Sequence, residues 1–531
     1  MTTTQSSSSK ADAFLQPLYH VRYLLARPLQ LRLLPSVIPV IPLPYLKSLP
    51  YVTVGQVLMM VPWLLLFVAG YDKTFHNADL GGGGKIASYA MICAFLTANK
   101  ANSVFQFFFG LSFERMVPIH NLYACLSLIL SVFHGYVAYK YGDARRRLGG
   151  SEESTMMDHE ERRLGHDSEY GLYGDDTNLW KFLWDGGTNL TGSLCTACLV
   201  GLVLFSFFRV IRQYLFEVWL FSHIIFSVGV VVFGVMHSVP ILLVPFAWWM
   251  VDVALRYGLQ AFGRFPTSAK LTKLGDDLVE VRFQRSFHFQ PGQFVQISIP
   301  AVGLMQFHPV TISSAPYEKD ATLHIRALGG WTKALVELAG RTQETNILVE
   351  GPYGNLSFGI ADETTYPVVL CIAGGIGVTP CQSVARYLIH EAEQGRKLDQ
   401  LRFTWVVRGT QLMDSMPTVA TDGRSYLADH ETGDESEASP SKSSRFYPEV
   451  YVTRANDEDL EGRNHVTKGR PDIQRIIEES IAVAKTKGAS RIAVVTCGPE
   501  RMVDEVKAAC RKSSGLCRSI ALDVHDEIFD F

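Results

Sequence analysis

Four histidines stand in apolar stretches of this sequence, in two matched pairs. The segments HNLYACLSLILSVFH and HIIFSVGVVVFGVMH each begin and end with a histidine, which gives His120 and His134 in the first and His223 and His237 in the second. A helix turns by about 100° and rises by about 1.5 Å per residue, so the two histidines of a segment share a face and lie about 21 Å apart. An ionisable residue inside a membrane helix is by default a functional candidate.

Imidazoles that approach one another from adjacent helices suit the two axial positions of a haem iron. If both segments cross a membrane in the same direction, His120 faces His223 at one depth and His134 faces His237 at another. These four residues are therefore the predicted metal ligands of two haem b groups. The alternatives are a proton relay, which usually adds Asp or Glu to the helices, and a metal transport site, which needs its ligands at one depth.

The elements that must carry these histidines are apolar helices in the first half of the chain. The 531 residues are 47% apolar and 11% aromatic, and the apolar residues are concentrated before residue 260. Each candidate span has about the twenty residues that a bilayer requires. The six predicted spans cover residues 52–70, 86–109, 116–138, 191–208, 218–237 and 239–257.

Charge indicates how the chain is oriented in the membrane. Residues 1–50 carry five Lys and Arg against a single acidic residue, Asp12, which predicts a cytoplasmic N-terminus, and an even number of spans returns the C-terminus to the same side. We therefore expect a multi-pass protein of the plasma membrane or an endomembrane, in contact with lipid. The net charge of −3 argues against a nucleic-acid partner. The long outer loop, 139–189, is acidic and is either solvated or a place where Fe(III) is captured.

The second half of the chain changes to short alternating strands and then to alternating strands and helices. This predicts a β-barrel at 264–365 and an α/β domain at 366–531, with a flexible insertion at 410–447. In the barrel, HPVTISSAP (308–316) and HIRALGGWT (324–332) contain residues suited to a flavin nucleotide: Thr311 to hydrogen-bond the ring and Arg326 to neutralise the pyrophosphate.

The α/β domain contains VVLCIAGGIGVTP (368–380), an apolar strand followed by a glycine-rich turn and a helix start. That arrangement holds phosphates against backbone N–H groups. Arg408 ends another strand, where a guanidinium recognises the 2′-phosphate that separates NADPH from NADH. Cys497, Gly498 and Pro499 are expected at the carboxyl edge of the sheet, where ligands bind in such folds.

The order of these motifs resembles the transmembrane ferric reductase and NADPH oxidase superfamily, across about residues 50–531. The resemblance implies a multi-domain membrane protein: a six-helix haem-binding bundle at 51–260, a β-barrel that binds FAD, and a Rossmann-like α/β domain of ferredoxin-reductase type that binds NADPH. It also implies that Phe531 stacks on the flavin ring and acts with Cys497 at the catalytic centre. The expected cofactor-binding residues are His308, Pro309, Val310, Thr311, His324, Arg326, Trp331, Thr332, Gly374, Gly375, Gly377, Thr379, Pro380, Arg408, Cys497, Gly498 and Pro499.

Three features bear on the final electron acceptor, a small molecule that is either a ferric chelate or O2. Only Ser238 and Val239 separate His237 from Pro240, so no large loop caps the outer haem. Ala138 stands where oxidases of this superfamily tend to carry a further histidine, and the outer loop is rich in hard oxygen ligands. We therefore predict an NADPH-dependent ferric-chelate reductase. The alternatives are a superoxide-forming NADPH oxidase and a catalytically silent haem-binding scaffold.

Overall fold

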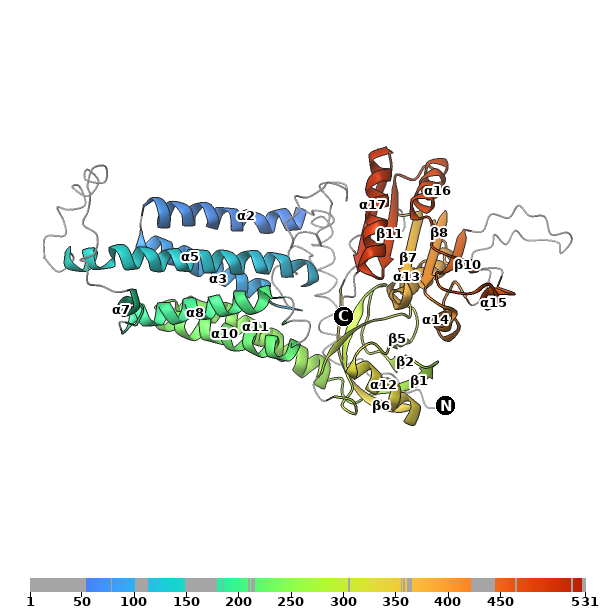
Figure 1. Cartoon of the computed structure of the whole chain (residues 1–531), viewed down its shortest axis with the longest axis horizontal. Coiled ribbons are helices and arrows are strands. Elements are labelled where there is room, and N and C mark those ends of the chain that lie inside the picture. Colours follow the sequence, from blue (N-terminus) through green and yellow to red (C-terminus); the bar gives the residue numbers. More distant parts are fainter. Residues whose placement is uncertain are drawn as a thin grey trace. The chain divides into compact units, whose positions relative to one another are not determined.

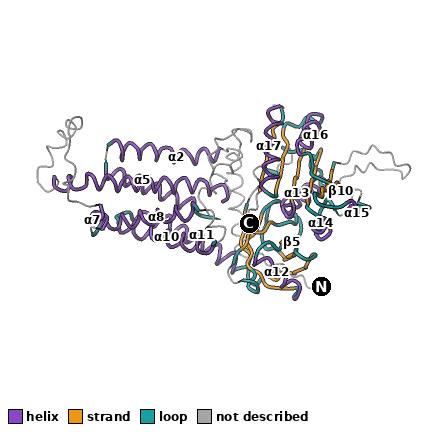
Figure 2. The backbone as a smooth tube through the Cα atoms, in the orientation of Figure 1, coloured by secondary structure: helices purple, strands orange, loops and turns teal. Residues whose placement is uncertain are grey.

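The computed structural model divides into two compact units, which are considered separately (Figure 1). The first consists of Gly55–Asp252 and is helical, and the second contains the residues from Val253 onward and holds all the strands of the described part (Figure 2). The structure describes residues 54–77, 79–100, 113–148, 179–184, 186–208, 211, 215–303, 306–354, 356, 359–360, 365–421, 445–463, 466–516 and 519–527.

A helix lies at each of the six segments that were predicted to span a membrane. Four helical stretches of the described part are long and apolar enough to cross one: Met116–Lys140, Thr188–Phe207, Val218–Met236 and Pro240–Phe262. The helices are α2 (Val54–Gly70), α3 (Leu80–Thr97), α5 (Phe113–Leu148), α8 (Thr188–Phe207), α10 (Phe216–Met236) and α11 (Leu243–Ala254), with the shorter η1 (Tyr71–His76), α7 (Leu179–Trp184), η2 (Pro240–Leu242) and η3 (Leu255–Phe262).

Two helices extend beyond the spans predicted for them. Helix α3 begins at Leu80, before the span predicted at 86–109, because the side chain of Asp79 accepts a hydrogen bond from the N–H of Gly82 at 2.9 Å and caps the helix. The span predicted at 116–138 coincides with the apolar stretch Met116–Lys140 of α5, and the helix continues to Leu148, so the start of the predicted outer loop is helical. The acidic residues of that loop after 148, and residues 1–50, lie outside the described residues.

The helices of the first unit pack in pairs along their length. Helix α3 lies against α5, and α8 lies against α10. Helix α2 is tied to α5 by two bonds to backbone carbonyls: Trp63 Nε1 donates to Leu122 O at 3.1 Å, and Tyr123 Oη donates to Met59 O at 2.9 Å. The two pairs meet where α5 contacts α8, and the histidines of α5 lie near those of α10 and its C-terminal end, about a hundred residues later in sequence.

The barrel of the second unit is a closed antiparallel sheet. Its strand order is β4-β3-β6-β1-β2-β5, and a bridge between Ile312 and Leu323 joins the two edges. Alternate residues of β2 and β3 point into a core that includes Val281, Val295 and Ile297. The elements are β1 (Thr267–Leu274), β2 (Leu278–Gln284), β3 (Phe294–Ser298), β4 (His308–Thr311), β5 (Asp320–Arg326), α12 (Gly330–Arg341) and β6 (Glu344–Tyr353).

The α/β domain is a parallel sheet in the order β10-β9-β8-β7-β11-β12. Strand β7 is buried along its whole length, as expected for a central parallel strand. The elements are β7 (Val368–Gly374), η4 (Gly375–Gly377), α13 (Val378–Glu393), β8 (Gln400–Val407), α14 (Thr410–Ser415), β9 (Phe446–Val452), α15 (Asp457–Leu460), β10 (Val466–Lys468), α16 (Ile473–Thr486), β11 (Arg491–Cys497), α17 (Glu500–Leu516) and β12 (Ala521–Glu527).

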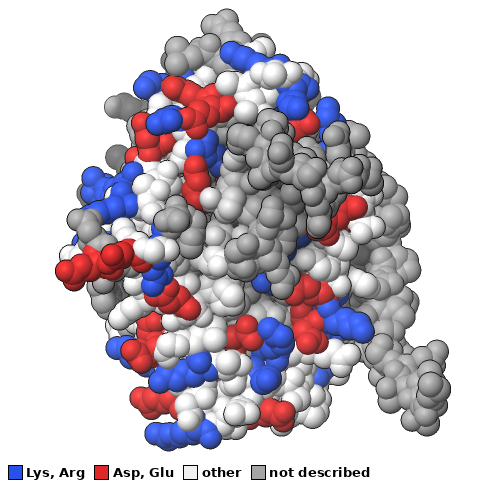
Figure 3. Space-filling view, turned by 90° about the vertical axis from the view of Figure 1, so that its right-hand side faces the viewer, with Lys and Arg blue, Asp and Glu red and all other residues white. Residues whose placement is uncertain are grey.

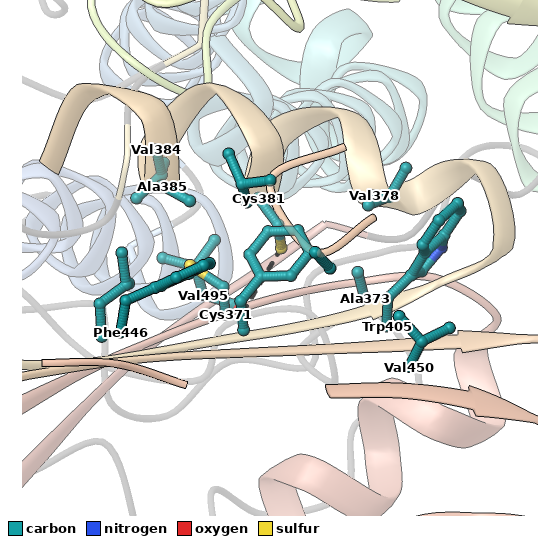
Figure 4. Close-up of a cluster of buried hydrophobic side chains, with 14 of the residues drawn as sticks. Cys371, Ala373, Val378, Cys381, Val384, Ala385, Trp405, Phe446, Val450 and Val495 are labelled. Atoms are coloured by element: carbon teal, nitrogen blue, oxygen red, sulfur yellow. Dashed lines mark hydrogen bonds between the residues drawn. The ribbon is translucent and has the colours of Figure 1, made fainter. Parts of the chain in front are cut away.

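Helix α13 covers one face of this sheet. Figure 4 shows Cys381 of the helix above Cys371 of the sheet, with Trp405 and Val378 packed beside them. The predicted flexible insertion at 410–447 is wrong at its start, because residues 410–415 form α14 and the buried side chains of Leu412 and Met413 hold it to the core. Residues 422–444 lie outside the described residues.

The charged side chains of the second unit are mixed in sign. On the face seen in Figure 3, Lys and Arg alternate with Asp and Glu over the described surface, and neither sign forms a continuous patch there. Arg402 illustrates this pattern, because its guanidinium bonds both Glu449 and Glu479 at 2.7 Å.

Candidate functional site

The structure brings the four histidines together in the pairs that the sequence predicts. The ring centroids of His120 on α5 and His223 on α10 are 6.4 Å apart, and those of His134 and His237 are 6.2 Å apart. We call these the 120/223 pair and the 134/237 pair. No group of three or more His, Cys, Asp and Glu side chains that could hold a metal ion occurs within the described residues, so a metal at either pair would need the rest of its ligands from elsewhere.

Both separations fit two imidazoles on opposite sides of one iron. A metal–imidazole bond is about 2 Å long, and the coordinating nitrogen lies about 1.2 Å from the ring centre, so the expected centroid separation is about 6.4 Å. A haem supplies the four equatorial nitrogens that two histidines lack. The spacing of the rings is therefore compatible with bis-histidine haem ligation at both depths.

The second ring nitrogen of three histidines already has a protein partner. The Nδ1 atoms of His120 and His237 lie 2.9 Å from the carbonyl oxygens of Ala94 and Thr188, respectively. The Nδ1 atom of His223 lies 3.3 Å from Ser206 Oγ. Histidines that bind a metal usually donate the hydrogen of their other nitrogen in this way, which leaves Nε2 available to a metal.

On the barrel, strand β4 and helix α12 meet at an aromatic contact. His308 stacks on Trp331, with ring centroids 4.1 Å apart and planes 29° from parallel. Burial lowers the pKa of His308, so its ring is neutral at pH 7. The hydroxyl of Thr311 is buried without a hydrogen-bond partner among the described residues, as is the indole N–H of Trp331. Buried polar atoms that lack a partner are what a site for a polar ligand leaves open.

Two further barrel residues, Pro309 and Val310, form the middle of β4. They pair with Gln296 and Val295 of β3 and are partly buried. They therefore place His308 and Thr311 at the two ends of one short strand.

His324 on β5 is surrounded by protein groups. Its Nδ1 lies 2.8 Å from Ser313 Oγ, and its Nε2 lies 3.6 Å from a carboxylate oxygen of Glu280. Burial, with a smaller effect of the positive charges on Arg386 and Arg282, lowers the pKa of His324 to about 4. These contacts hold the neutral ring within the barrel wall.

Arg326 and Thr332, two predicted nucleotide ligands, already have intramolecular partners. Arg326 Nε donates to Asp277 Oδ2 at 2.7 Å, but both side chains are more than a third exposed, so this ion pair can exchange for another anion. The hydroxyl of Thr332 accepts from the N–H groups of Leu328 and Gly329 at 2.9 and 2.8 Å. Thr332 therefore caps the start of α12.

The glycine-rich turn after β7 meets the turn after β11. A Cβ atom on Gly377 would lie 2.6 Å from the carbonyl oxygen of Cys497, and one on Gly374 would lie 2.8 Å from Pro499. Gly375 has a φ of 57° and Gly498 a φ of 158°, which L side chains rarely adopt. The two predicted motifs thus pack backbone against backbone at the carboxyl edge of the sheet, where Gly374, Gly377 and Gly498 are buried and Gly375 is partly exposed.

The remaining predicted residues of this domain lie around that surface. Thr379 donates to Ile376 O at 3.2 Å, and Pro380 is buried in the first turn of α13. Arg408, directly after β8, is exposed, and no ion pair of its side chain is found in the described part of the chain.

Of the two predicted catalytic residues, Cys497 and Phe531, the structure describes only Cys497. The side chain of Cys497 is fully buried, and burial together with the nearby Glu527 raises the pKa of its thiol well above the usual value. The thiol is therefore neutral at pH 7 and is not a thiolate nucleophile. Phe531 lies outside the described residues.

Helix α13 also joins the two lobes of this unit. Ser383 Oγ donates to Ser314 O in the barrel at 2.8 Å, and Gly292 N donates back to Ser383 Oγ at 3.4 Å. Ser314 lies three residues after the end of β4. The bond therefore connects the β4 segment, which begins at His308, to helix α13, which follows the glycine-rich turn. The two predicted nucleotide-binding surfaces belong to one compact unit.

Sequence reasoning missed several residues at these sites. Asp277, the partner of Arg326, lies in a β-turn with no motif, and Trp405, whose indole N–H bonds Gly375 O at 2.8 Å, reads as an ordinary core residue. Gly192 and Ser206 both face a histidine. They are fourteen residues apart, as are the histidines of each segment, and this spacing is a signal in the sequence that could have identified them.

Three family models match successive parts of the chain. A ferric reductase like transmembrane component matches residues 84–234, an FAD-binding domain matches 264–357, and a ferric reductase NAD binding domain matches 366–511. The boundaries of the last two models follow the barrel and the α/β domain. The chain thus contains a transmembrane component followed by FAD-binding and NAD-binding domains.

Relatives with similar sequences are NADPH oxidases. NADPH oxidase 3 of Homo sapiens is 32% identical over 189 residues, or 32% of this chain and 33% of that protein. NADPH oxidase 3 of Rattus norvegicus is 30% identical over 302 residues, or 50% of each. NADPH oxidase 1 of Mus musculus is 24% identical over 477 residues, or 76% of this chain and 77% of that protein. The first two alignments span a third and a half of the relatives' own length.

Proposed function

This chain belongs to the transmembrane ferric reductase and NADPH oxidase superfamily, and from that premise we propose that it carries electrons from NADPH across a membrane to a ferric chelate. One observation carries the proposal. Four histidine rings form the 120/223 pair and the 134/237 pair, with centroid separations of 6.4 and 6.2 Å, inside an apolar helical unit. A proton relay does not need two rings at the spacing of one iron, and a transport site does not need two depths.

Each domain has a distinct task in this proposal. Nicotinamide supplies a hydride, flavin divides it into single electrons, and haem passes them one at a time. In the α/β domain, the partly exposed backbone at Gly375 holds the phosphates of NADPH, and Arg408 selects its 2′-phosphate. In the barrel, Thr311 orients the flavin ring and Arg326 exchanges Asp277 for the pyrophosphate.

In the membrane unit, the four histidines hold two haems by Nε2. Their Nδ1 contacts, to Ala94 O, Thr188 O and Ser206 Oγ, fix the ring orientation of three of them. Two imidazoles at each pair would leave a bound iron no position for oxygen, so the haems held by these histidines would supply single-electron transfer.

Two observations favour a bulky chelate as the acceptor. Helix α10 ends at Met236, and only His237, Ser238 and Val239 precede η2, so this connection is too short to cap the 134/237 pair. Ala138, one turn after His134, offers no polar group for orienting oxygen. We place the protein in the plasma membrane or an endomembrane, with both termini on the NADPH side.

The second candidate is a superoxide-forming NADPH oxidase, which the similarity to NADPH oxidases 1 and 3 favours. The two functions share every cofactor and differ only in the acceptor.

The experiment that separates the two functions uses full-length protein that has been loaded with haem and FAD and inserted into lipid vesicles. NADPH is added outside the vesicles, so that it reaches only those molecules whose nucleotide domain faces outward. Fe(II) formed from a ferric chelate inside is captured by an encapsulated chelator, with and without encapsulated superoxide dismutase. Iron reduction that resists the dismutase and persists without oxygen supports the ferric reductase. Reduction that collapses under either condition identifies the oxidase, and vesicles without protein control for leakage.

A further inference from the structure

Two glycines lie against the rings of the 134/237 pair. A Cβ atom on Gly192 of α8 would lie 2.7 Å from Cε1 and 2.9 Å from Nδ1 of His237. A Cβ atom on Gly84 of α3 would lie 3.0 Å from Cε1 and 3.4 Å from Nε2 of His134. A contact of 2.7 Å is shorter than carbon atoms tolerate, so the ring of His237 occupies space that only glycine leaves open. A contact of 3.0 Å is tight, and the ring of His134 would have to shift by a few tenths of an ångström.

The ring of His237 has little freedom to move away from an added methyl group. Its Nδ1 is held by Thr188 O, on the same helix as Gly192, at 2.9 Å. The backbone N–H of His237 bonds Phe233 O at 2.8 Å, and the next residue, Ser238, has a φ of 70°. The chain turns sharply at this point, so the ring position is fixed from both sides. His134, in the middle of α5, has no such second clamp in the described structure.

The 120/223 pair is surrounded differently. Thr97 Oγ1 of α3 lies 3.5 Å from His120 Nδ1, and Ser206 Oγ of α8 lies 3.3 Å from His223 Nδ1. The same two helices, α3 and α8, therefore present a glycine to each ring of the 134/237 pair and a hydroxyl to each ring of the 120/223 pair. Helix α8 also presents a hydroxyl to His237, because Thr191 Oγ1 lies 3.5 Å from its Nδ1, so the glycine contacts are what distinguish the 134/237 pair.

We propose that Gly84 and Gly192 are positioning residues that set the ring orientation of the 134/237 pair, and thereby allow this pair, and not the 120/223 pair, to hold its haem in a crossed-ring geometry. The inference rests on the proposed haem ligation. The ring planes of the 134/237 pair are 79° apart, whereas those of the 120/223 pair are 55° apart. A methyl group on either glycine turns the facing ring and changes that angle.

The angle between two axial imidazoles has a spectroscopic signature. The low-spin ferric EPR signal of a haem with two imidazole ligands moves to a higher maximal g value as the ring planes approach the perpendicular. The proposal therefore predicts two separate low-spin signals in the unchanged protein, and assigns the one with the higher maximal g value to the 134/237 pair.

The test compares single variants of the full-length protein, purified in detergent, by haem content, EPR and FAD content. We expect Gly192→Ala to lose the signal with the higher g value and to keep about half of the haem, because its Cβ contact is the shorter one. We expect Gly84→Ala to keep its haem, because a ring at 3.0 Å yields by a few tenths of an ångström, and to shift the same signal to lower g.

Two matched controls separate ring positioning from general crowding. Gly201→Ala places a Cβ 2.9 Å from the ring of Phe226, across the same α8–α10 contact, without touching a histidine. Gly135→Ala follows His134 directly, and its Cβ meets nothing within 4 Å. Both should keep the two signals at the positions seen in the unchanged protein. A retained signal of the 120/223 pair shows that the helical unit of a variant has folded, and an unaltered FAD content shows the same for the second unit.

The outcomes distinguish the inference from the function on which it rests. If the unchanged protein shows no low-spin signal of bis-imidazole haem, the proposed function fails. If it shows two signals that neither Gly84→Ala nor Gly192→Ala alters, the positioning role is overturned and the haem ligation stands. If Gly201→Ala produces the same loss as Gly192→Ala, crowding of the helix pair explains the effect and the proposal is also overturned.

Discussion

The two compact units build their binding surfaces from different parts of the chain. In the helical unit the candidate ligands are side chains, four imidazoles that two helix pairs bring to 6.4 and 6.2 Å. In the second unit the candidate nucleotide surface is backbone, made by turns at Gly375, Gly377 and Gly498 where a Cβ would collide or where φ is positive. A side-chain site fails when the side chain is removed, whereas a backbone site fails when a side chain is added.

The largest expected effect is the loss of a side chain in the helical unit. His237→Ala removes one axial ligand, so we expect the haem of the 134/237 pair to be lost and transmembrane reduction to fall at least about a hundredfold. NADPH oxidation with a soluble acceptor dye should persist, because the second unit is unchanged. Haem content and the two rates are the measurements, and an unchanged haem content would contradict the ligand assignment.

The matching change in the second unit is the addition of a methyl group. Gly377→Ala places a Cβ 2.6 Å from Cys497 O, a backbone atom that has no rotamer to change. We expect a cost of about 1–3 kcal/mol and up to about a hundredfold rise in the KM for NADPH. Haem content should stay the same. Gly340→Ala, whose Cβ meets nothing within 4 Å, is the control, and a KM that does not rise in Gly377→Ala counts against a backbone site.

A smaller effect is expected where a side chain assists the backbone surface. Arg408→Gln removes an exposed guanidinium, and a charge-assisted hydrogen bond is worth about 1.5 kcal/mol or more, so the KM for NADPH should rise about tenfold. The KM for NADH should not change, because NADH has no 2′-phosphate. Steady-state rates with both nucleotides provide the measurement. Equal effects on both would remove the support for the 2′-phosphate role.

The smallest effect concerns stability and pH. The pKa of His324 is about 4 in the folded barrel against an ordinary value of 6.5, so the unfolded chain binds a proton that the folded chain excludes. The contribution of the neutral His324 to the stability of this unit is therefore fully present above pH 6.5 and is lost as the pH falls toward 4, with about 1.4 kcal/mol lost at about pH 5.5. The temperature of FAD release should fall with pH over this range, and less steeply in His324→Gln. Parallel pH profiles for the two proteins would refute the assignment.

The sequence predicted the elements that depend on spacing along the chain. The histidine intervals, the six apolar segments and the strand-turn-helix at 368–380 are local periodicities, and each appears in the structure where expected. The start of α3 and the end of α5 lie beyond the predicted spans, because a capping side chain, Asp79, and a polar continuation of the helix to Leu148 decided them, and hydropathy does not register either. The start of the predicted insertion was wrong because α14 buries Leu412 and Met413.

By itself the sequence determined which residues are candidates, because residue type and local periodicity are properties of neighbours in the chain. Only the tertiary structure decided how the candidates are arranged: that Arg326 pairs with Asp277, that Thr332 caps a helix, and that the thiol of Cys497 is buried. It also decided that Gly192 faces His237, forty-five residues later in the chain. Such contacts depend on how two elements cross in space. The spacing of residues within either element gives no information about that crossing.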